Sequence, residues 1–425
     1  MINNLKTNKI KTEKSMELLA PVGNPDKLKL AIHYGADAVY LASKRFGLRT
    51  FAGNFDEEQL KWAVEYVHNA GKKIYVTINI LPHDSDFDGL DDYIKSLDAL
   101  GVDAIIVADL GVLRVAKRVA PKLDIHISTQ ANVLNSETAN FYADLGVKRI
   151  ILARELSLEE IKNIRDNLPR DIELECFGHG AMCISYSGRC LLSTFMTGRD
   201  ANRGACVQAC RWNYTIRETN KKDEYPIEED SKGTYILNSH DMCMIEHLDK
   251  LRDAGIASIK VEGRMKSEYY VANIINAYRQ ALDYMDSHKT YDLPSEIANE
   301  VNKSSHRTYS TGFFFGDAKQ NLETSMPKAD YNFIAIVLED TKDGKALVEM
   351  RNRFEVNSTL EVLSKFNNNA IIHINKIEDD QGNLIEDVKV VQQRVYVYTD
   401  QPLHKYDILR NKKLVVRLLE EIDKM

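Results

Sequence analysis

The sequence predicts a TIM-like (β/α)8 barrel followed by a small all-β barrel. Over residues 16–290, short apolar segments alternate with segments of helical period. A glycine precedes several of the apolar segments, as in YGADAVYL, LGVDAIIV, LGVKRIIL and AGIASIKV, and glycine suits the left-handed position that ends a helix. From about Tyr331 the helical period gives way to short alternating segments separated by turn residues.

Eight apolar segments of the first part are expected to be strands, and the helices between them make successive strands parallel. These segments are 17–21, 37–42, 73–79, 104–109, 125–130, 149–154, 172–177 and 258–263. Eight such units predict a closed barrel, with 267–287 as the closing helix. An open doubly wound sheet is the alternative, although no G-x-G-x-x-G turn follows the first strand. A ninth strand-like segment, 234–239, leaves open which candidate lies outside the barrel.

The chain is expected to have four parts. A flexible tail, 1–15, precedes a catalytic barrel, 16–290, in which 180–233 form a cysteine-rich insertion loop. A linker, 291–330, leads to a C-terminal β-barrel, 331–425, which shows no catalytic constellation and is therefore interpreted as a binding or docking module. Strands of this second barrel are expected at 333–340, 346–351, 359–364, 370–377, 395–400 and 415–420.

Composition bounds the class of protein. Hydrophobic residues make up 44% of the chain and charged residues 28%, as in ordinary soluble proteins. The net charge of −7 argues against a wholly basic nucleic-acid coat but allows a local basic patch. The N-terminus is polar and basic without a following apolar region, and no apolar run approaches the roughly 20 residues that span a bilayer. We expect a cytoplasmic protein with no membrane partner.

Residues 175–214 contain five of the six cysteines, at positions 176, 183, 190, 206 and 210. Thiols concentrated in a chain without a secretion signal favour a metal or iron–sulfur site over disulfides. Buried cysteines that act as small hydrophobic residues are the alternative. The spacing does not match the short paired pattern of zinc ribbons and fits a four-thiolate iron–sulfur site better.

Polar residues end most of the expected strands, where a (β/α)8 barrel carries its reacting groups. Lys260, Glu262 and Arg264 alternate along one strand and should therefore project from one face. Asp109, by contrast, is equally well explained as a helix cap. The candidate catalytic residues are Gln130, Arg154, His179, Lys260, Glu262 and Arg264.

The cysteine-rich loop is locally basic. Residues 180–217 contain five arginines and a single acid, Asp200, with tyrosine and tryptophan interleaved. Positive charge and aromatic faces are what an extruded base and its phosphates require. Arginines that pair with acids elsewhere, or that neutralise a thiolate cluster, are the alternative. The candidate RNA-binding residues are Arg189, Arg199, Arg203, Arg211, Trp212 and Tyr214.

Segments 175–193 and 198–214 closely resemble the signature of the collagenase-like peptidase family U32. The resemblance also covers ELLAPVGN, STQANVLN, LARELSLEEI, GTYILNSHD, IKVEGRMKS and the C-terminal barrel, and it is strongest to the bacterial members that form 5-hydroxyuridine in tRNA. It implies a barrel domain with an oxygen-sensitive four-iron, four-sulfur (4Fe–4S) cluster. It also implies hydroxylation of the wobble uridine in tRNA anticodons, with prephenate rather than dioxygen supplying the hydroxyl oxygen.

The resemblance assigns the cluster to four cysteines, namely Cys183, Cys190, Cys206 and Cys210. It leaves Cys176 and Cys243 as packing residues. In related quinone-hydroxylating members the fourth cysteine lies farther downstream, near Ser231 here, so a set that includes Cys243 instead of Cys210 is an alternative. Four cysteine ligands would leave no open iron, which favours an electron-transfer or structural role. Prephenate is a dicarboxylate that Arg154, Lys260 and Arg264 could grip.

Two other classes of function stay open. The family name implies a peptidase, yet the sequence contains neither H-E-x-x-H nor G-x-S-x-G. His179 and Cys183 could mimic a Cys–His pair, but a thiolate bound to iron cannot also be a nucleophile, and no third group to orient the histidine is evident. The other class is a non-catalytic subunit, because some relatives act as pairs; a companion family member or a second copy of the chain would then be the partner.

Overall fold

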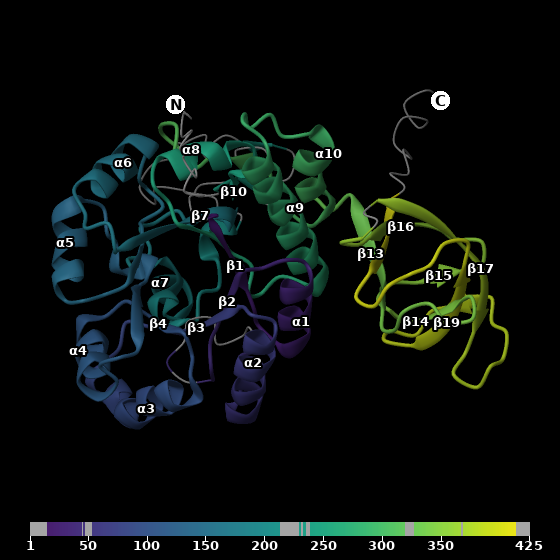
Figure 1. Ribbon diagram of the computed structural model, residues 1–425, viewed down its shortest axis with the longest axis horizontal. Coiled ribbons are helices and arrows are strands. Elements are labelled where there is room, and N and C mark those ends of the chain that lie inside the picture. Colours follow the sequence, from purple (N-terminus) through teal and green to yellow (C-terminus); the bar gives the residue numbers. More distant parts are fainter. Residues whose placement is uncertain are drawn as a thin grey trace, which may run out of the picture.

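Eight parallel strands close the larger of two barrels in the computed structural model (Figure 1). The structure describes residues 15–44, 46, 53–212, 229–230, 233–234, 239–318, 327–366 and 369–413. The barrel strands are β1 (Glu17–Pro21), β2 (Ala38–Leu41), β3 (Lys73–Ile78), β4 (Ala104–Val107), β5 (Asp124–Ile127), β6 (Arg149–Ile151), β7 (Glu173–Ala181) and β11 (Ser258–Val261). They follow one another around the barrel, and β11 pairs with both β7 and β1. The predicted TIM-like barrel is confirmed.

All eight predicted strand positions are occupied by strands, so the barrel has no place for the ninth candidate. Most of segment 234–239 lies outside the described residues. Its first residue ends β9 (Gly233–Thr234), which pairs with β8 (Glu229–Asp230) apart from the barrel. The barrel sheet is extended instead by β10 (Asp241–Cys243), antiparallel to the end of β7, and by β12 (Tyr309–Ser310).

Helices surround the barrel in an outer ring (Figure 1). They are α1 (Pro25–His33), α2 (Glu57–Asn69), α3 (Leu90–Leu100), α4 (Leu110–Val119), α5 (Ser136–Asp144), α6 (Leu158–Asp166), α8 (Leu248–Asp253) and α9 (Glu268–Ser287). Side chains cap several N-termini; Asp109, for example, accepts hydrogen bonds from the backbone N–H groups of Gly111 and Val112 at 2.7 and 3.1 Å. Asp109 therefore has the structural role that the sequence left as an alternative.

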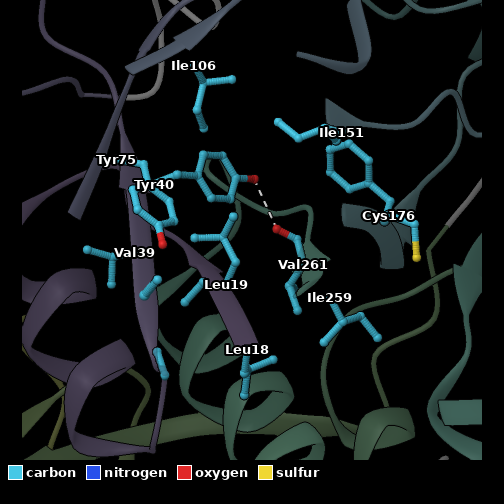
Figure 2. Packing of buried hydrophobic residues seen from close by; sticks show 14 of the residues in the cluster. Leu18, Leu19, Val39, Tyr40, Tyr75, Ile106, Ile151, Cys176, Ile259 and Val261 are labelled. Atoms are coloured by element: carbon cyan, nitrogen blue, oxygen red, sulfur yellow. Dashed lines mark hydrogen bonds between the residues drawn. The ribbon is translucent and has the colours of Figure 1, made fainter. Parts of the chain in front are cut away.

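The barrel interior combines apolar packing with a buried ionic network. Figure 2 shows Leu19, Tyr40, Tyr75 and Val261 packed together, with the Tyr40 hydroxyl donating to the Val261 carbonyl at 3.0 Å. Nearby, the fully buried guanidinium of Arg149 contacts three carboxylates, those of Glu17 at 2.6 Å, Glu173 at 2.6 Å and Glu175 at 3.0 Å. A buried charge needs such partners to offset its desolvation.

The smaller barrel is antiparallel and closed. Its strands are β13 (Tyr331–Val337), β14 (Lys345–Met350), β16 (Thr359–Leu363), β17 (Ala370–Glu378), β19 (Arg394–Thr399) and β20 (Ile408–Lys412), in the order β13-β14-β19-β17-β16-β20. A short pair, β15 (Phe354–Glu355) and β18 (Asp387–Val388), lies beside it. The predicted strand at 415–420 lies outside the described residues. The closing strand is β20, which the sequence hid because buried Arg410 interrupts its apolar pattern.

Residues 291–330, expected to be a linker, contain secondary structure of their own. They form α10 (Ser295–Ala298), the 3-10 helix η6 (Asn299–Lys303) and β12. Arg410 of β20 lies 2.6 Å from Glu300 of η6 and donates at 2.8 Å to Asn273 of α9, so it joins the two barrels. Of the predicted tail 1–15, only Ser15 is among the described residues. In the described part of the chain, no helix has the length and apolar character needed to cross a membrane.

Candidate active site and cysteine loop

A cavity of about 140 Å³ lies at the C-terminal mouth of the larger barrel. The cysteine-rich loop covers it, so that strand ends and cysteines share one chamber. Among the residues that line it are Tyr40, Asn79, Ser128, Gln130, Arg154, Tyr186, Cys183, Cys190, Cys206, Cys210, Lys260, Glu262 and Arg264. The structure thus brings together all four predicted cluster cysteines and five of the six predicted catalytic residues.

Backbone contacts hold the loop over the mouth. The Leu81 N–H donates to the Asn202 carbonyl at 3.1 Å, and the Asn202 side chain donates to the Cys190 carbonyl at 3.0 Å. Gly188 has a φ of 73°, and a Cβ there would lie only 2.8 Å from the carbonyl oxygen of Gln130. Glycine is therefore required where the loop passes the end of β5.

The four loop cysteines differ in their exposure to solvent. Cys183 is exposed, while Cys190, Cys206 and Cys210 are half-buried, and none is in a disulfide. Burial raises the pKa of the Cys210 thiol, and the charges of the other three thiols, which oppose the effect of Arg211, add to the increase. The Gln208 N–H donates to the Cys206 sulfur at 3.3 Å, as N–H groups do around iron–sulfur clusters.

The four loop thiols all line the same cavity, so one shared group could bind them together. Among the described residues, no three Cys, His, Asp or Glu side chains converge closely enough to hold one metal ion. A zinc ion would need four ligands within about 2.3 Å. In a cluster, by contrast, each thiolate binds its own iron, so the sulfurs surround a larger object. Four thiols spread around one cavity agree with the second arrangement.

Arg154, at the end of β6, anchors the start of the loop. Its guanidinium donates to the Ala181 carbonyl at 3.0 Å and to the Ser187 hydroxyl at 3.1 Å. Although burial lowers the pKa of Arg154, the adjacent Cys183 thiolate raises it above the usual value. Arg154 therefore supplies positive charge next to a predicted cluster ligand.

Lys260 and Arg264 are buried cations that line the cavity. The Lys260 ammonium lies 3.4 Å from the Glu175 carboxylate and 4.2 Å from the centre of the Tyr40 ring. Burial lowers the pKa of Lys260, while the charge of Glu175 opposes that change. Arg264 donates to the Asn54 side chain at 2.5 Å. Asn54 was missed because nothing in its sequence context marks it as a partner of Arg264.

His179 does not line the cavity, contrary to the prediction. A bulge in β7 pairs Lys260 with Phe177 but Val261 with His179, so one residue is skipped and the alternation of side chains shifts. The His179 ring consequently packs outside the barrel, between Tyr278 at 5.4 Å and Tyr309 at 5.3 Å. Burial lowers its pKa to about 3, which keeps the ring neutral.

The two remaining cysteines lie away from the cavity. Cys176 is buried in the apolar cluster of the barrel, where Figure 2 shows it among the packed side chains, and it does not line the cavity. Cys243 lies in β10, with its sulfur 3.9 Å from the Tyr278 hydroxyl, and burial raises its pKa to about 11. Both positions agree with packing roles, and the alternative ligand set with Cys243 lacks support from this arrangement.

The predicted RNA-binding residues differ in their surroundings. Arg203 forms a bidentate ion pair with Asp86, at 2.5 and 2.9 Å, and thereby fits the alternative of an arginine paired with a distant acid. Arg211 donates to the Met182 carbonyl at 3.2 Å. Arg189, Arg199 and Trp212 are exposed. Tyr214 lies outside the described residues.

The loop also exposes apolar side chains that the sequence analysis did not single out. Phe195 on α7 (Leu192–Thr197) is 81% exposed, and the neighbouring Leu191 and Met196 are also exposed. A short helix in a loop carries too few residues for a clear periodic signal, which is why these positions were missed.

Comparison with known proteins places these features in a family. Residues 23–324 match the family described as "Peptidase family U32", and residues 329–410 match its C-terminal domain. The "tRNA hydroxylation protein P1" of Bacillus subtilis is 38% identical over 94% of this chain and 96% of its own length. The "tRNA hydroxylation protein P" of Escherichia coli is 35% identical over 82% of this chain and 86% of its own length. The "23S rRNA 5-hydroxycytidine C2501 synthase" of Escherichia coli is 40% identical over 63% of this chain and 39% of its own length.

Proposed function

The chain belongs to peptidase family U32, and from that premise we propose that it is a tRNA-modification enzyme that hydroxylates the wobble uridine at C5. Prephenate is the proposed hydroxyl donor, and a 4Fe–4S cluster on the four loop cysteines the proposed cofactor. One observation carries the proposal: a single cavity brings the four cysteines together with the cations Arg154, Lys260 and Arg264. Relatives named for RNA hydroxylation support the reaction class.

The proposed reaction requires a second substrate that donates a hydroxyl group. Replacing the C5–H of uridine by C5–OH is a two-electron oxidation. If the donor R–OH gives its hydroxyl to uridine and takes a hydrogen in return, the products are 5-hydroxyuridine and R–H, and the donor is reduced by two electrons. Prephenate carries such a hydroxyl together with two carboxylates.

Buried cations suit the carboxylates of this donor. Lys260 and Arg264 are 4% and 3% exposed, and charge-assisted hydrogen bonds are strong where water is excluded. Glu175 compensates Lys260 from inside the barrel, so the ammonium is held in place before a ligand arrives. An arginine offers two parallel N–H groups to a carboxylate, and Asn54 orients that fork at Arg264.

The cluster, when bound, would supply electron transfer or fix the loop. Three contacts of the chain would determine its position: the Asn202 side chain donates to the Cys190 carbonyl, the Gln208 N–H donates to the Cys206 sulfur, and Arg154 places positive charge beside Cys183. Positive charge at this position offsets the negative charge of several thiolates.

The peptidase alternative finds no support in the described site. His179 packs outside the barrel between tyrosines, whereas Cys183 lines the cavity, so the two do not form a nucleophile–base pair. The alternative of a non-catalytic subunit is separated from the proposal by assaying the chain alone.

The test is anaerobic purification of the single chain, followed by iron and sulfide analysis and by incubation with unmodified tRNA. We expect 5-hydroxyuridine, detected by mass spectrometry of nucleosides, only when prephenate is added. Product that needs dioxygen but not prephenate would contradict the proposed donor. Iron-loaded protein that is inactive until a companion chain is added would instead support the subunit alternative.

A further inference from the structure

A second, larger pocket adjoins the cavity and shares part of its lining. Its volume is about 510 Å³, within the range of about 300–1,000 Å³ that is usual for ligand sites. The pocket and the cavity share Cys183, Ile184 and Tyr186 as a common wall. Two compartments of different size therefore meet at the cysteine loop, and only the larger has the volume expected for a nucleotide.

The larger pocket has the aromatic surface that a flipped base needs. Tyr186, in the common wall, is 50% exposed, and Phe313 lines the pocket as well. Enzymes that modify a base extrude it from its stack and hold it against aromatic side chains. A base stacked on Tyr186 would lie beside the wall that separates it from the smaller cavity, where the donor is proposed to bind.

Glu155 provides a polar group without an assigned role. It lies in the LARELS segment, directly after Arg154, and lines the pocket. Its Oε2 atom is buried, and the described residues offer it no hydrogen-bond partner. Leaving such an acceptor unsatisfied is costly, so a ligand N–H in this position would be favoured. Burial raises the pKa of this carboxyl, although Arg154 opposes the change.

Uracil presents a matching donor. Its Watson–Crick edge has an N3–H between two carbonyl oxygens. In the pocket wall the Ser310 hydroxyl accepts from the Gly312 N–H at 3.3 Å, so its own proton can be donated to one of these oxygens. Cytosine has a lone pair at N3 instead, which a carboxylate would repel. Glu155 could thus distinguish the two pyrimidines.

We propose that the larger pocket receives the extruded uracil base and that Glu155 accepts its N3–H, which makes Glu155 a specificity-determining residue. The inference rests on the proposed function, since it identifies where that reaction holds its RNA substrate. This assignment gives a role to the larger pocket, since the donor and the cluster are proposed to bind in the smaller cavity.

Binding of synthetic anticodon stem–loops to anaerobically prepared enzyme tests the proposal. The RNAs carry uridine, N3-methyluridine or cytidine at the wobble position. We expect the wild type to bind the uridine RNA about tenfold more tightly than the other two, which is the loss expected for one buried hydrogen bond. Glu155→Ala should bind all three with the weaker affinity. Glu159→Gln, an exposed position on α6, should behave as the wild type.

A second variant guards against misfolding. Glu155→Gln keeps the side-chain size, and its amide can either accept from uracil N3–H or donate to cytosine N3, so the preference for uridine should shrink at unchanged melting temperature. Discrimination that persists at tenfold in Glu155→Ala, or that is absent in the wild type, would overturn the pocket assignment. Failure of the proposed function differs from both outcomes, because the wild type would then form no 5-hydroxyuridine.

Discussion

The Arg154 guanidinium donates to the Ser187 hydroxyl at 3.1 Å, so a side chain at the end of β6 holds the turn that carries Cys183. This contact links the barrel scaffold to the candidate cluster. A lysine at position 154 would keep the charge but could not reach both the Ala181 carbonyl and Ser187 with a planar fork. We expect Arg154→Lys to retain less iron than the wild type, with a smaller change in melting temperature than Arg154→Ala. Iron content measured on matched anaerobic preparations checks this.

The four candidate cluster ligands line the cavity, whereas Cys176 and Cys243 do not. Cys190→Ser should abolish the brown absorbance and make residues 180–212 more sensitive to protease, because the loop loses the group that holds it. Cys176→Ser and Cys243→Ser should keep nearly full iron content, since neither residue lines the cavity. Absorption spectra together with iron and sulfide analysis of each variant show which of them lose the cluster. Loss of the cluster in Cys243→Ser but not in Cys210→Ser would show that the downstream ligand set is correct.

Exposed cations of the loop should contribute to RNA affinity. Arg189 is exposed, and Arg189→Glu is expected to weaken tRNA binding without loss of iron. Binding by the wild type should fall steeply with salt, and the slope of log affinity against log salt should decrease by about one in Arg189→Ala if one phosphate contact is lost. Arg203→Glu is the contrasting variant: its ion pair with Asp86 holds the loop, so it should reduce iron retention as well. Salt-independent binding would contradict a phosphate-contacting surface.

The ion pairs of Arg410 should control how the two barrels stay joined. Its guanidinium is fully buried and lies 2.6 Å from both Glu300 and Glu361. Arg410→Ala leaves Lys303, at 3.1 and 2.7 Å, as the remaining cation partner of these two carboxylates among the described residues, and breaking a buried ion pair typically costs about 3–5 kcal/mol of unfolding free energy. Urea unfolding measures this loss. Arg353→Ala removes an ion pair between an exposed arginine and Asp387, and its unfolding free energy should stay close to that of the wild type. An equal loss of unfolding free energy in the two variants would refute the role of Arg410.

Sequence patterns predicted the barrel because eight apolar segments and their glycine joins repeat regularly, and the resemblance to the family indicated which four thiols belong together. Local irregularities escaped prediction. The bulge that turns His179 away inserts one residue into β7, and no sequence period reveals it. The pairs Arg203–Asp86 and Arg264–Asn54 join residues more than a hundred positions apart, and only the folded chain shows which polar groups meet.

Arg264 supplies the sharpest test of donor binding. This arginine could bind a carboxylate of the donor or could only close the barrel, and the structure shows its guanidinium held by Asn54 in the wall of the cavity. Removing a guanidinium from a shielded carboxylate clamp costs about 2–5 kcal/mol, so Arg264→Ala should raise the prephenate concentration for half-maximal activity at least tenfold. Iron content and tRNA affinity should stay close to the wild type.

Asn54→Ala is the matched control for that variant. It keeps the guanidinium but removes the group that orients it, so the prephenate concentration for half-maximal activity should rise less than in Arg264→Ala. In the double variant this concentration should be little higher than in Arg264→Ala alone, because both changes act on the same contact. Titration of prephenate with melting temperatures from the same samples separates binding from stability. If Arg264→Ala lowers activity in step with melting temperature and added prephenate does not restore it, the arginine only supports the barrel, and prephenate must be gripped by other cations of the cavity.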